Sequence, residues 1–165
     1  MSINVWLCDL TYTQQVVSSE VMPAAIGEIA MYCESHISLP LAIRLFKYPE
    51  KLINALRTEQ PKVIGFSNYM WNSQLSYSFA EAIKAKFPRT IVVMGGPNFP
   101  LSKENQESFL RSRPAIDFYI EKEGEVPFCN LIRCLMELEF DIERVKKEKL
   151  GSVRAIAADG MFYAG

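Results

Sequence analysis

Residues 63–72 have the sequence VIGFSNYMWN, four mostly apolar residues followed at once by polar and aromatic ones. A short apolar run after a proline, here Pro61, is typical of a strand buried on both faces, as strands in parallel sheets are. In residues 75–87 apolar side chains then recur every three or four positions, as they do on one face of a helix. This part of the chain therefore predicts one β-α unit of a parallel sheet.

The same alternation recurs on both sides of this unit. Short apolar runs predict five strands, at 3–8, 41–46, 63–66, 90–94 and 117–120. Helical patterns are found at 23–33, 49–56, 75–87, 102–110 and 128–136. Five β-α units with right-handed crossovers form an α/β, doubly wound parallel sheet with helices on both faces. We expect the strand order 2-1-3-4-5, which places ligands at the carboxyl ends of the strands.

The C-terminal residues follow a different pattern. Residues 141–149 form a charged helical or linking stretch, and 153–165 resemble a β-hairpin around Asp159-Gly160, a favoured two-residue turn. We expect residues 1–150 to form one domain. Residues 151–165 are expected to begin a linker or hairpin that leads to a further C-terminal domain.

Composition limits the classes of function. The chain has 165 residues, 22% of them charged, and a net charge of −1, so it shows no basic footprint for nucleic acid. It has no apolar run near the roughly 20 residues that span a bilayer, and no basic-then-apolar leader. We therefore expect a cytoplasmic protein with neither nucleic acid nor membrane as a partner.

Metal-ligating residues are few. His36 is the only histidine, which excludes a site with two imidazoles from this chain. The four cysteines lack the spacing of metal-ligand pairs, so we expect reduced, mostly buried thiols and no metal site. They are Cys8, Cys33, Cys129 and Cys134.

Two of the predicted loops at the ligand edge are rich in polar side chains. Asp9, Thr11 and Gln14 lie in the loop after the first strand, which is longer than the typical βα loop of about 2–6 residues. That loop is either a binding loop or a flexible surface connection. The loop after the third strand combines a hydroxyl, amides and aromatic rings, which suit a large, flat, mostly uncharged ligand. Alternatively, Asn72 or Ser73 caps the next helix and Trp71 fills a space in the core.

The other two loops contain glycine. Gly95 and Gly96 follow the fourth strand, where they allow a positive φ and let a ligand approach the backbone, or form only a tight turn. They do not belong to a G-x-G-x-x-G dinucleotide motif. After the fifth strand, Gly124 provides a turn between acidic residues that favour a helix N-terminus.

Three stretches together resemble the N-terminal cobalamin-binding domains of cobalamin-dependent radical S-adenosylmethionine enzymes. They are residues 63–72 (VIGFSNYMWN), 91–97 (IVVMGGP) and 123–125 (EGE), and the resemblance extends over nearly the whole chain. It implies a flavodoxin-like fold, bound cobalamin and a small-molecule substrate. It also implies a C-terminal radical S-adenosylmethionine domain in the same polypeptide, which holds S-adenosylmethionine and a [4Fe-4S] cluster and catalyses methyl transfer or related chemistry. The cluster's C-x3-C-x2-C ligands are absent from these residues, so the chain alone is expected to be a binding module.

The resemblance also assigns site residues. Other cobalamin domains have a D-x-H-x-x-G loop whose histidine binds cobalt, and here Asp9 fits, while Thr11 replaces the histidine and Gln14 the glycine. We therefore expect cobalamin bound base-off, without a histidine ligand, its lower face covered by the loop from Asp9 to Gln14. In the S-x-L segment that lines the slot for the nucleotide tail, Ser67 matches and Tyr69 replaces leucine. The remaining candidates come from the glycine pair, from the matching stretches or from position alone: Asn68, Trp71, Gly95, Gly96, Pro97, Asn98, Glu123 and Gly124.

Three other functions share this predicted fold. A phosphorylation receiver domain could use Asp9 and Lys122, but Ser67 stands where its phosphoacceptor belongs. A flavodoxin-like redox protein could use the hydroxyls of residues 11–13, but no glycine opens that loop for a phosphate. A degenerate scaffold domain that no longer binds cobalamin stays open, because the histidine is missing.

Overall fold

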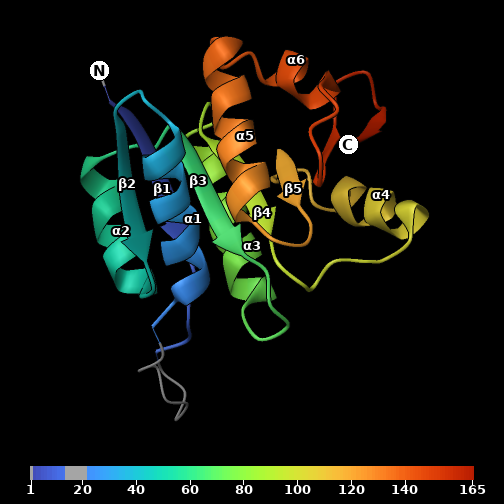
Figure 1. Ribbon diagram of the computed structural model, residues 1–165. Coiled ribbons are helices and arrows are strands. Elements are labelled where there is room, and N and C mark those ends of the chain that lie inside the picture. The colour runs from blue at the N-terminus through green and yellow to red at the C-terminus, as the bar shows by residue number, and fades with distance from the viewer. Residues whose placement is uncertain (1, 14–21) are drawn as a thin grey trace.

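The computed structural model describes residues 2–13 and 22–165, and Figure 1 shows it as a ribbon. The strands are β1 (Ile3–Cys8), β2 (Leu41–Phe46), β3 (Val63–Ser67), β4 (Ile91–Gly95), β5 (Phe118–Ile120), β6 (Val153–Ile156) and β7 (Phe162–Ala164). The helices are α1 (Ala24–His36), α2 (Pro49–Thr58), α3 (Ser73–Lys86), α4 (Lys103–Arg111), α5 (Glu125–Glu137) and α6 (Ile142–Lys147).

The first five strands are parallel and have the predicted order, β2-β1-β3-β4-β5. The predicted number of five strands is wrong, because the sheet of the described chain has seven. The predicted hairpin continues the same sheet: β6 pairs antiparallel with β5, and β7 pairs with β6. Without β6, the outer edge of β5 would leave its backbone groups unpaired, and the hairpin satisfies them. Its turn spans residues 157–161 rather than two residues, with Gly160 at φ 76°.

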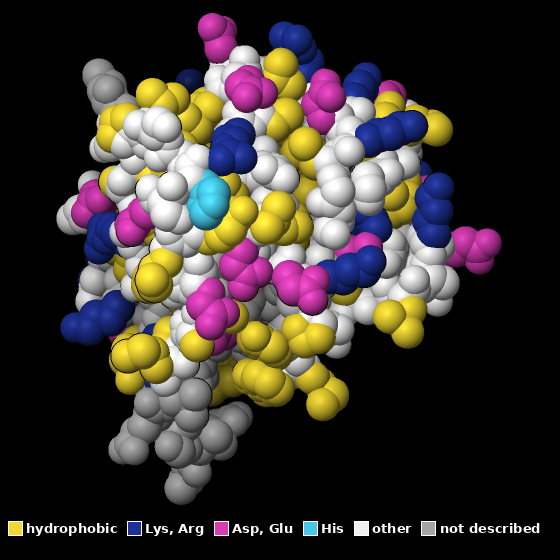
Figure 2. All heavy atoms as spheres, in the orientation of Figure 1, with side chains coloured by type: hydrophobic (Ala, Val, Ile, Leu, Met, Phe, Trp, Pro, Cys, Tyr) yellow, Lys and Arg dark blue, Asp and Glu magenta, His cyan; other side chains and the backbone are white. Residues whose placement is uncertain are grey.

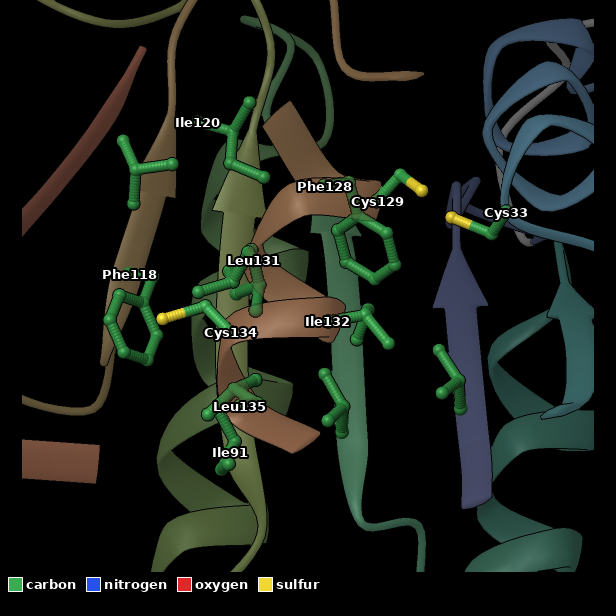
Figure 3. Close-up of a cluster of buried hydrophobic side chains, with 14 of the residues drawn as sticks. Cys33, Ile91, Phe118, Ile120, Phe128, Cys129, Leu131, Ile132, Cys134 and Leu135 are labelled. Atoms are coloured by element: carbon green, nitrogen blue, oxygen red, sulfur yellow. The ribbon is translucent and has the colours of Figure 1, made fainter. Parts of the chain in front are cut away.

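Successive residues of the central strands face opposite sides of the sheet, and each side has its own core. Helices α1, α5 and α6 cover one face, and α2, α3 and α4 cover the other (Figure 1). In β3, Val63 packs under α1 and α5 while Ile64 packs toward α2 and α3. The apolar side chains of α5 point toward the strands in Figure 3. Burial on both faces explains why these strands are continuous apolar runs.

The four cysteines are free and buried, as predicted. Cys33 of α1 and Cys129 of α5 point toward each other between the two helices (Figure 3). Burial, followed by the neighbouring Cys129, raises the pKa of the Cys33 thiol to about 12. The Cys33 thiol therefore stays protonated near neutral pH and acts as a small apolar group of the core.

Within residues 2–13 and 22–165, no helix is long and apolar enough to cross a membrane. The same residues contain no group of three or more histidine, cysteine, aspartate or glutamate side chains placed to hold a metal ion.

Candidate functional site

The turns after β1, β3, β4 and β5 meet at one edge of the sheet. The parallel register sets Cys8 beside Phe66 and Phe66 beside Met94, and Gly95 pairs with Ile120. The strands therefore end at nearly the same level, and the residues that follow them lie close together. Gln14, also a candidate, lies outside the described residues.

A pocket of about 220 Å³ opens at this edge, between α1, α5 and the ends of β3, β4 and β5. Its walls are mostly apolar, and Ile29 of α1 and Phe128 of α5 belong to them. Seven of the predicted site residues line it: Ser67, Tyr69, Gly95, Gly96, Pro97, Glu123 and Gly124. The other described candidates do not line it: Asp9, Thr11, Asn68, Trp71 and Asn98.

Two glycines form the floor of this pocket. Gly65 and Gly95 lie on the face of the sheet that α1 and α5 cover, in the same alternation as Val63 and Val93. A Cβ atom at Gly65 would come within 2.9 Å of Leu7 Cδ2, and one at Gly95 within 3.2 Å of the Ile120 carbonyl oxygen. The floor therefore has no side chain at these two positions. Sequence reasoning missed Gly65 as a site residue, although a glycine inside an apolar strand signals close approach of another group.

Buried side chains hold the turn after β4 in place through hydrogen bonds. Gly96 has φ 124°, and a Cβ there would lie 2.9 Å from the Asn68 carbonyl oxygen. The Tyr119 hydroxyl donates to the Gly96 carbonyl oxygen at 2.8 Å and accepts from the Asn68 amide at 2.9 Å. That amide also donates to the Asn98 carbonyl oxygen at 2.7 Å. Asn68 and Asn98 therefore hold the turn in shape rather than face the pocket.

Tyr119, which sequence reasoning did not single out, is fully buried at the centre of these hydrogen bonds. Burial raises the pKa of its phenol, so the hydroxyl keeps its proton and remains a donor. Nothing in the local pattern of β5 distinguishes Tyr119 from the apolar residues beside it. Its role depends on Asn68 and Gly96, which are distant in sequence.

A second cluster ties the loop after β1 to the end of β3. The Ser67 hydroxyl donates to Asp9 Oδ1 at 2.5 Å, and the buried Asn72 amide donates to the same oxygen at 3.2 Å. Asn72 also donates to Ser67 Oγ at 3.0 Å and to the Leu10 carbonyl oxygen at 3.2 Å. Its Oδ1 accepts from the Tyr69 backbone N–H at 2.9 Å. Hydrogen bonds from Ser67 and Asn72 therefore hold the half-buried Asp9 carboxylate in place.

These contacts overturn two alternatives for the loop after β3. Asn72 stands at the N-cap of α3, but its side chain makes no capping hydrogen bond because it serves the cluster with Asp9. Trp71 is 67% exposed and does not plug the core. Its ring stacks on Tyr69, with centroids 4.6 Å apart and planes 3° apart. The pocket beside this stack stays open.

The only histidine lies away from the pocket. α1 begins at the pocket with Ala25 and ends at His36, roughly 16 Å further along a helix that rises about 1.5 Å per residue. His36 stacks on Tyr32 there. Thr11, at the position of the missing histidine, is half-buried, and its backbone N–H donates to the Lys47 carbonyl oxygen at 3.1 Å.

Among the described residues, the charged side chains that line the pocket belong to the turn after β5 and the first turn of α5. They are Lys122, Glu123 and Glu125. Gly124 lets this turn lie against α1, since a Cβ there would meet Ile29 Cδ1 at 2.7 Å. Figure 2 shows acidic side chains gathered on this face, near the N-terminal end of α5.

The sequence matches the family described as B12 binding domain over residues 16–132. The chain belongs to that family. The resemblance carried by residues 63–72, 91–97 and 123–125 is thereby confirmed at the level of the family, and with it cobalamin as the family's cofactor.

Two curated relatives resemble this B12-binding domain. The cobalamin-dependent radical SAM methyltransferase TokK of Streptomyces tokunonensis is 33% identical over 116 residues, which cover 67% of this chain and 16% of TokK. The 2-(S-pantetheinyl)-carbapenam-3-carboxylate methyltransferase of Streptantibioticus cattleyicolor is 32% identical over 116 residues, with the same coverage. The chain thus matches only 16% of the length of these relatives.

Solved structures agree on the fold. The cobalamin-dependent S-adenosylmethionine radical enzyme OxsB, with aqua-cobalamin and S-adenosylmethionine bound, matches 99% of this chain and 22% of its own, with a TM-score of 0.70 and 16% identity. The response regulator DrrB of Thermotoga maritima matches 99% of this chain and 64% of its own, with a TM-score of 0.62 and 18% identity. The flavodoxin-like fold class is confirmed, and both types of protein share it.

Proposed function

We propose that this chain binds cobalamin at the carboxyl edge of the sheet, with the nucleotide tail in the pocket between α1 and α5. Support comes from membership of the B12-binding domain family and from the pocket itself. The observation that carries the proposal is the glycine floor. Gly65 and Gly95 leave room between sheet and helices where any side chain would fill it.

The lining of the pocket fits such a tail. Its interior is apolar, with Phe128 and Ile29 in its walls, and the charged groups among its described lining residues lie at its mouth. It therefore suits an uncharged aromatic heterocycle. Ser67 and Tyr69 border it from the β3 side and would orient the ligand. Trp71, stacked on Tyr69 and exposed, offers an aromatic surface at the rim.

We infer that the corrin is held base-off, without a ligand from a protein histidine. His36 lies at the far end of α1, and Thr11 occupies the position where other cobalamin domains have histidine. Asp9, which would orient such a histidine, is engaged by Ser67 and Asn72 instead. The loop from Asp9 toward Gln14 is proposed to cover the lower face of the corrin.

We further propose that the chain works with a C-terminal radical S-adenosylmethionine domain that holds S-adenosylmethionine and a [4Fe-4S] cluster. The coverage of 16% of the curated relatives supports a larger enzyme around this domain. Bound cobalamin supplies a cobalt centre that can carry a methyl group. The proposed reaction is methyl transfer to a small molecule in the cytoplasm, or related radical chemistry, with residues 151–165 leading toward the catalytic domain.

The alternative is a scaffold that kept the fold and lost the cofactor. Absorbance titration of the 165-residue chain with hydroxocobalamin distinguishes the two. We expect a saturable spectral change with one equivalent of corrinoid, and a coloured protein after gel filtration. A colourless protein without spectral change would leave the scaffold as the better interpretation.

A further inference from the structure

Lys122 occupies an unusual position at the mouth of the pocket. It follows β5 directly and has φ 64°, a left-handed conformation that residues other than glycine adopt infrequently. Its exposed side chain lines both the pocket and a second hollow of about 560 Å³ on the α4 side. The two cavities share Lys122 with Gly96 and Pro97. Lys122 therefore stands at the boundary between them.

The ammonium group of Lys122 is available to a ligand. It has no hydrogen-bonding or ion-pair partner within residues 2–13 and 22–165. The next cation, Arg154, forms a partly buried ion pair with Glu121, and Gln106 is hydrogen-bonded to both side chains. Lys103 lines the second hollow and not the pocket. Among the described residues that line the pocket, Lys122 is the only cation.

Without Lys122, the acidic side chains around the mouth of the pocket would repel an anion. Glu123 and Glu125 line the same opening, and their carboxylates repel negative charge at short range. The nucleotide tail of cobalamin combines an uncharged heterocycle with a phosphodiester that carries one negative charge. An apolar interior accepts the heterocycle, so the phosphate stays near the mouth and needs a positive partner there.

We propose that the Lys122 ammonium binds the phosphate of the nucleotide tail and makes the pocket selective for corrinoids that carry this phosphate. The inference rests on the proposed binding of cobalamin in this pocket. The left-handed backbone at Lys122 fits the role, because residues in such conformations cluster at ligand sites.

Three corrinoids distinguish the contribution of the phosphate to binding from that of the rest of the ligand. Cobalamin has both phosphate and heterocycle, cobinamide phosphate has the phosphate alone, and cobinamide has neither. Binding of each aquated form to the wild-type chain and to Lys122→Gln is followed by absorbance. We expect the substitution to weaken binding of cobalamin and cobinamide phosphate by about tenfold, as for loss of a charged hydrogen bond. Affinity for cobinamide should stay the same.

Two matched variants test the charge argument. Lys103→Gln removes a nearby cation that does not line the pocket, and it should leave all three affinities within about twofold of wild type, since exposed charges at a distance are screened by salt. Glu123→Gln removes a repelling carboxylate and should strengthen binding of the two phosphate-bearing corrinoids only. Raising the salt concentration should weaken cobalamin binding to the wild type more than to Lys122→Gln.

The outcomes separate the two proposals. A wild-type chain that takes up no cobalamin refutes the proposed function, and the role of Lys122 with it. A wild-type chain that binds cobalamin, combined with an equal loss for cobalamin and cobinamide in Lys122→Gln, refutes the role of Lys122 alone. Unchanged cobalamin affinity in that variant, or an equal loss in Lys103→Gln, refutes it as well.

Discussion

At the scale of single residues, the candidate site depends on positions where a side chain is absent. Gly65, Gly95 and Gly96 border the pocket, but they differ in what a substitution would disturb. At Gly96 the φ of 124° and the nearby Asn68 backbone make any side chain a source of strain. At Gly65 the nearest atom to a new Cβ is the end of the Leu7 side chain, which can move. Gly65 is therefore the better position for a substitution that fills the pocket, because such a substitution strains the backbone less there.

We expect Gly65→Val to weaken binding of aquated cobalamin by at least about tenfold, because the methyl groups of valine enter the space proposed for the tail. Overpacking against Leu7 should cost only ~1–3 kcal/mol of unfolding free energy, so the chain stays folded. Gly65→Ala should show an intermediate loss. Absorbance titration gives the affinity, and circular dichroism with urea unfolding gives the stability.

Gly27 of α1 provides the control for Gly65. A Cβ at Gly27 meets no atom within 4 Å, and the residue does not line the pocket. Gly27→Ala should stabilise the chain by about 0.5–1 kcal/mol, as alanine does in a helix, and leave the affinity unchanged. Wild-type affinity in Gly65→Val would mean that the tail does not enter this pocket.

At the scale of elements, the β6–β7 hairpin is joined to the parallel sheet by charge as well as by backbone pairing. Arg154 of β6 forms an ion pair with Glu121, and their side chains are only 11% and 17% exposed. Gln106 of α4 donates to Glu121 at 3.0 Å and accepts from Arg154 at 3.3 Å. A buried charge that loses its partner is strongly destabilising. This cluster therefore links the hairpin, the end of β5 and α4.

We expect Arg154→Met to lower the free energy of unfolding by about 2–4 kcal/mol, because Glu121 is left buried without a cation. The double variant Arg154→Met/Glu121→Gln should recover most of this loss, since no unpaired charge remains. Urea unfolding followed by circular dichroism measures both. Equal stability of Arg154→Met and wild type would show that the hairpin does not depend on this pair.

The sequence predicted the elements that repeat and missed the contacts between distant ones. The five parallel strands follow from local apolar runs, and the glycine pair at 95–96 is visible as a turn. The addition of β6 to the edge of β5 depends on residues more than 30 positions apart, such as Tyr119 and Arg154. An asparagine directly before a helical pattern predicts a helix cap, because that pattern is local. The actual partners of Asn72, Asp9 and Leu10, are distant in sequence.

At the scale of the whole molecule, the pocket with the glycine floor lies on the face of the sheet that α1 and α5 cover. α2 and α3 pack on the bulky side chains of Trp6, Ile64 and Met94. On the opposite face, the glycine floor leaves the pocket under the ends of α1 and α5. Receiver domains share this fold, so strand order alone does not distinguish the functions. What points to a tail-binding protein here is the apolar pocket with its glycine floor under α1 and α5.

The position of the pocket between α1 and α5 predicts where bound cobalamin changes the dynamics of the chain. At 100 times the Kd, a ligand that binds only the folded state adds about 2.7 kcal/mol of stability. Amides that exchange through local opening around the pocket should slow most: the first turns of α1 and α5 and the turn after β4. Amides that exchange by fraying of α2 and α3 should keep their exchange rates, because those helices lie on the opposite face of the sheet.

Hydrogen exchange with mass spectrometry measures both sets of amides. Cobinamide, which lacks the tail, should protect the pocket amides much less than cobalamin does. Protection confined to α2 and α3, or equal protection by cobinamide, would contradict tail insertion between α1 and α5.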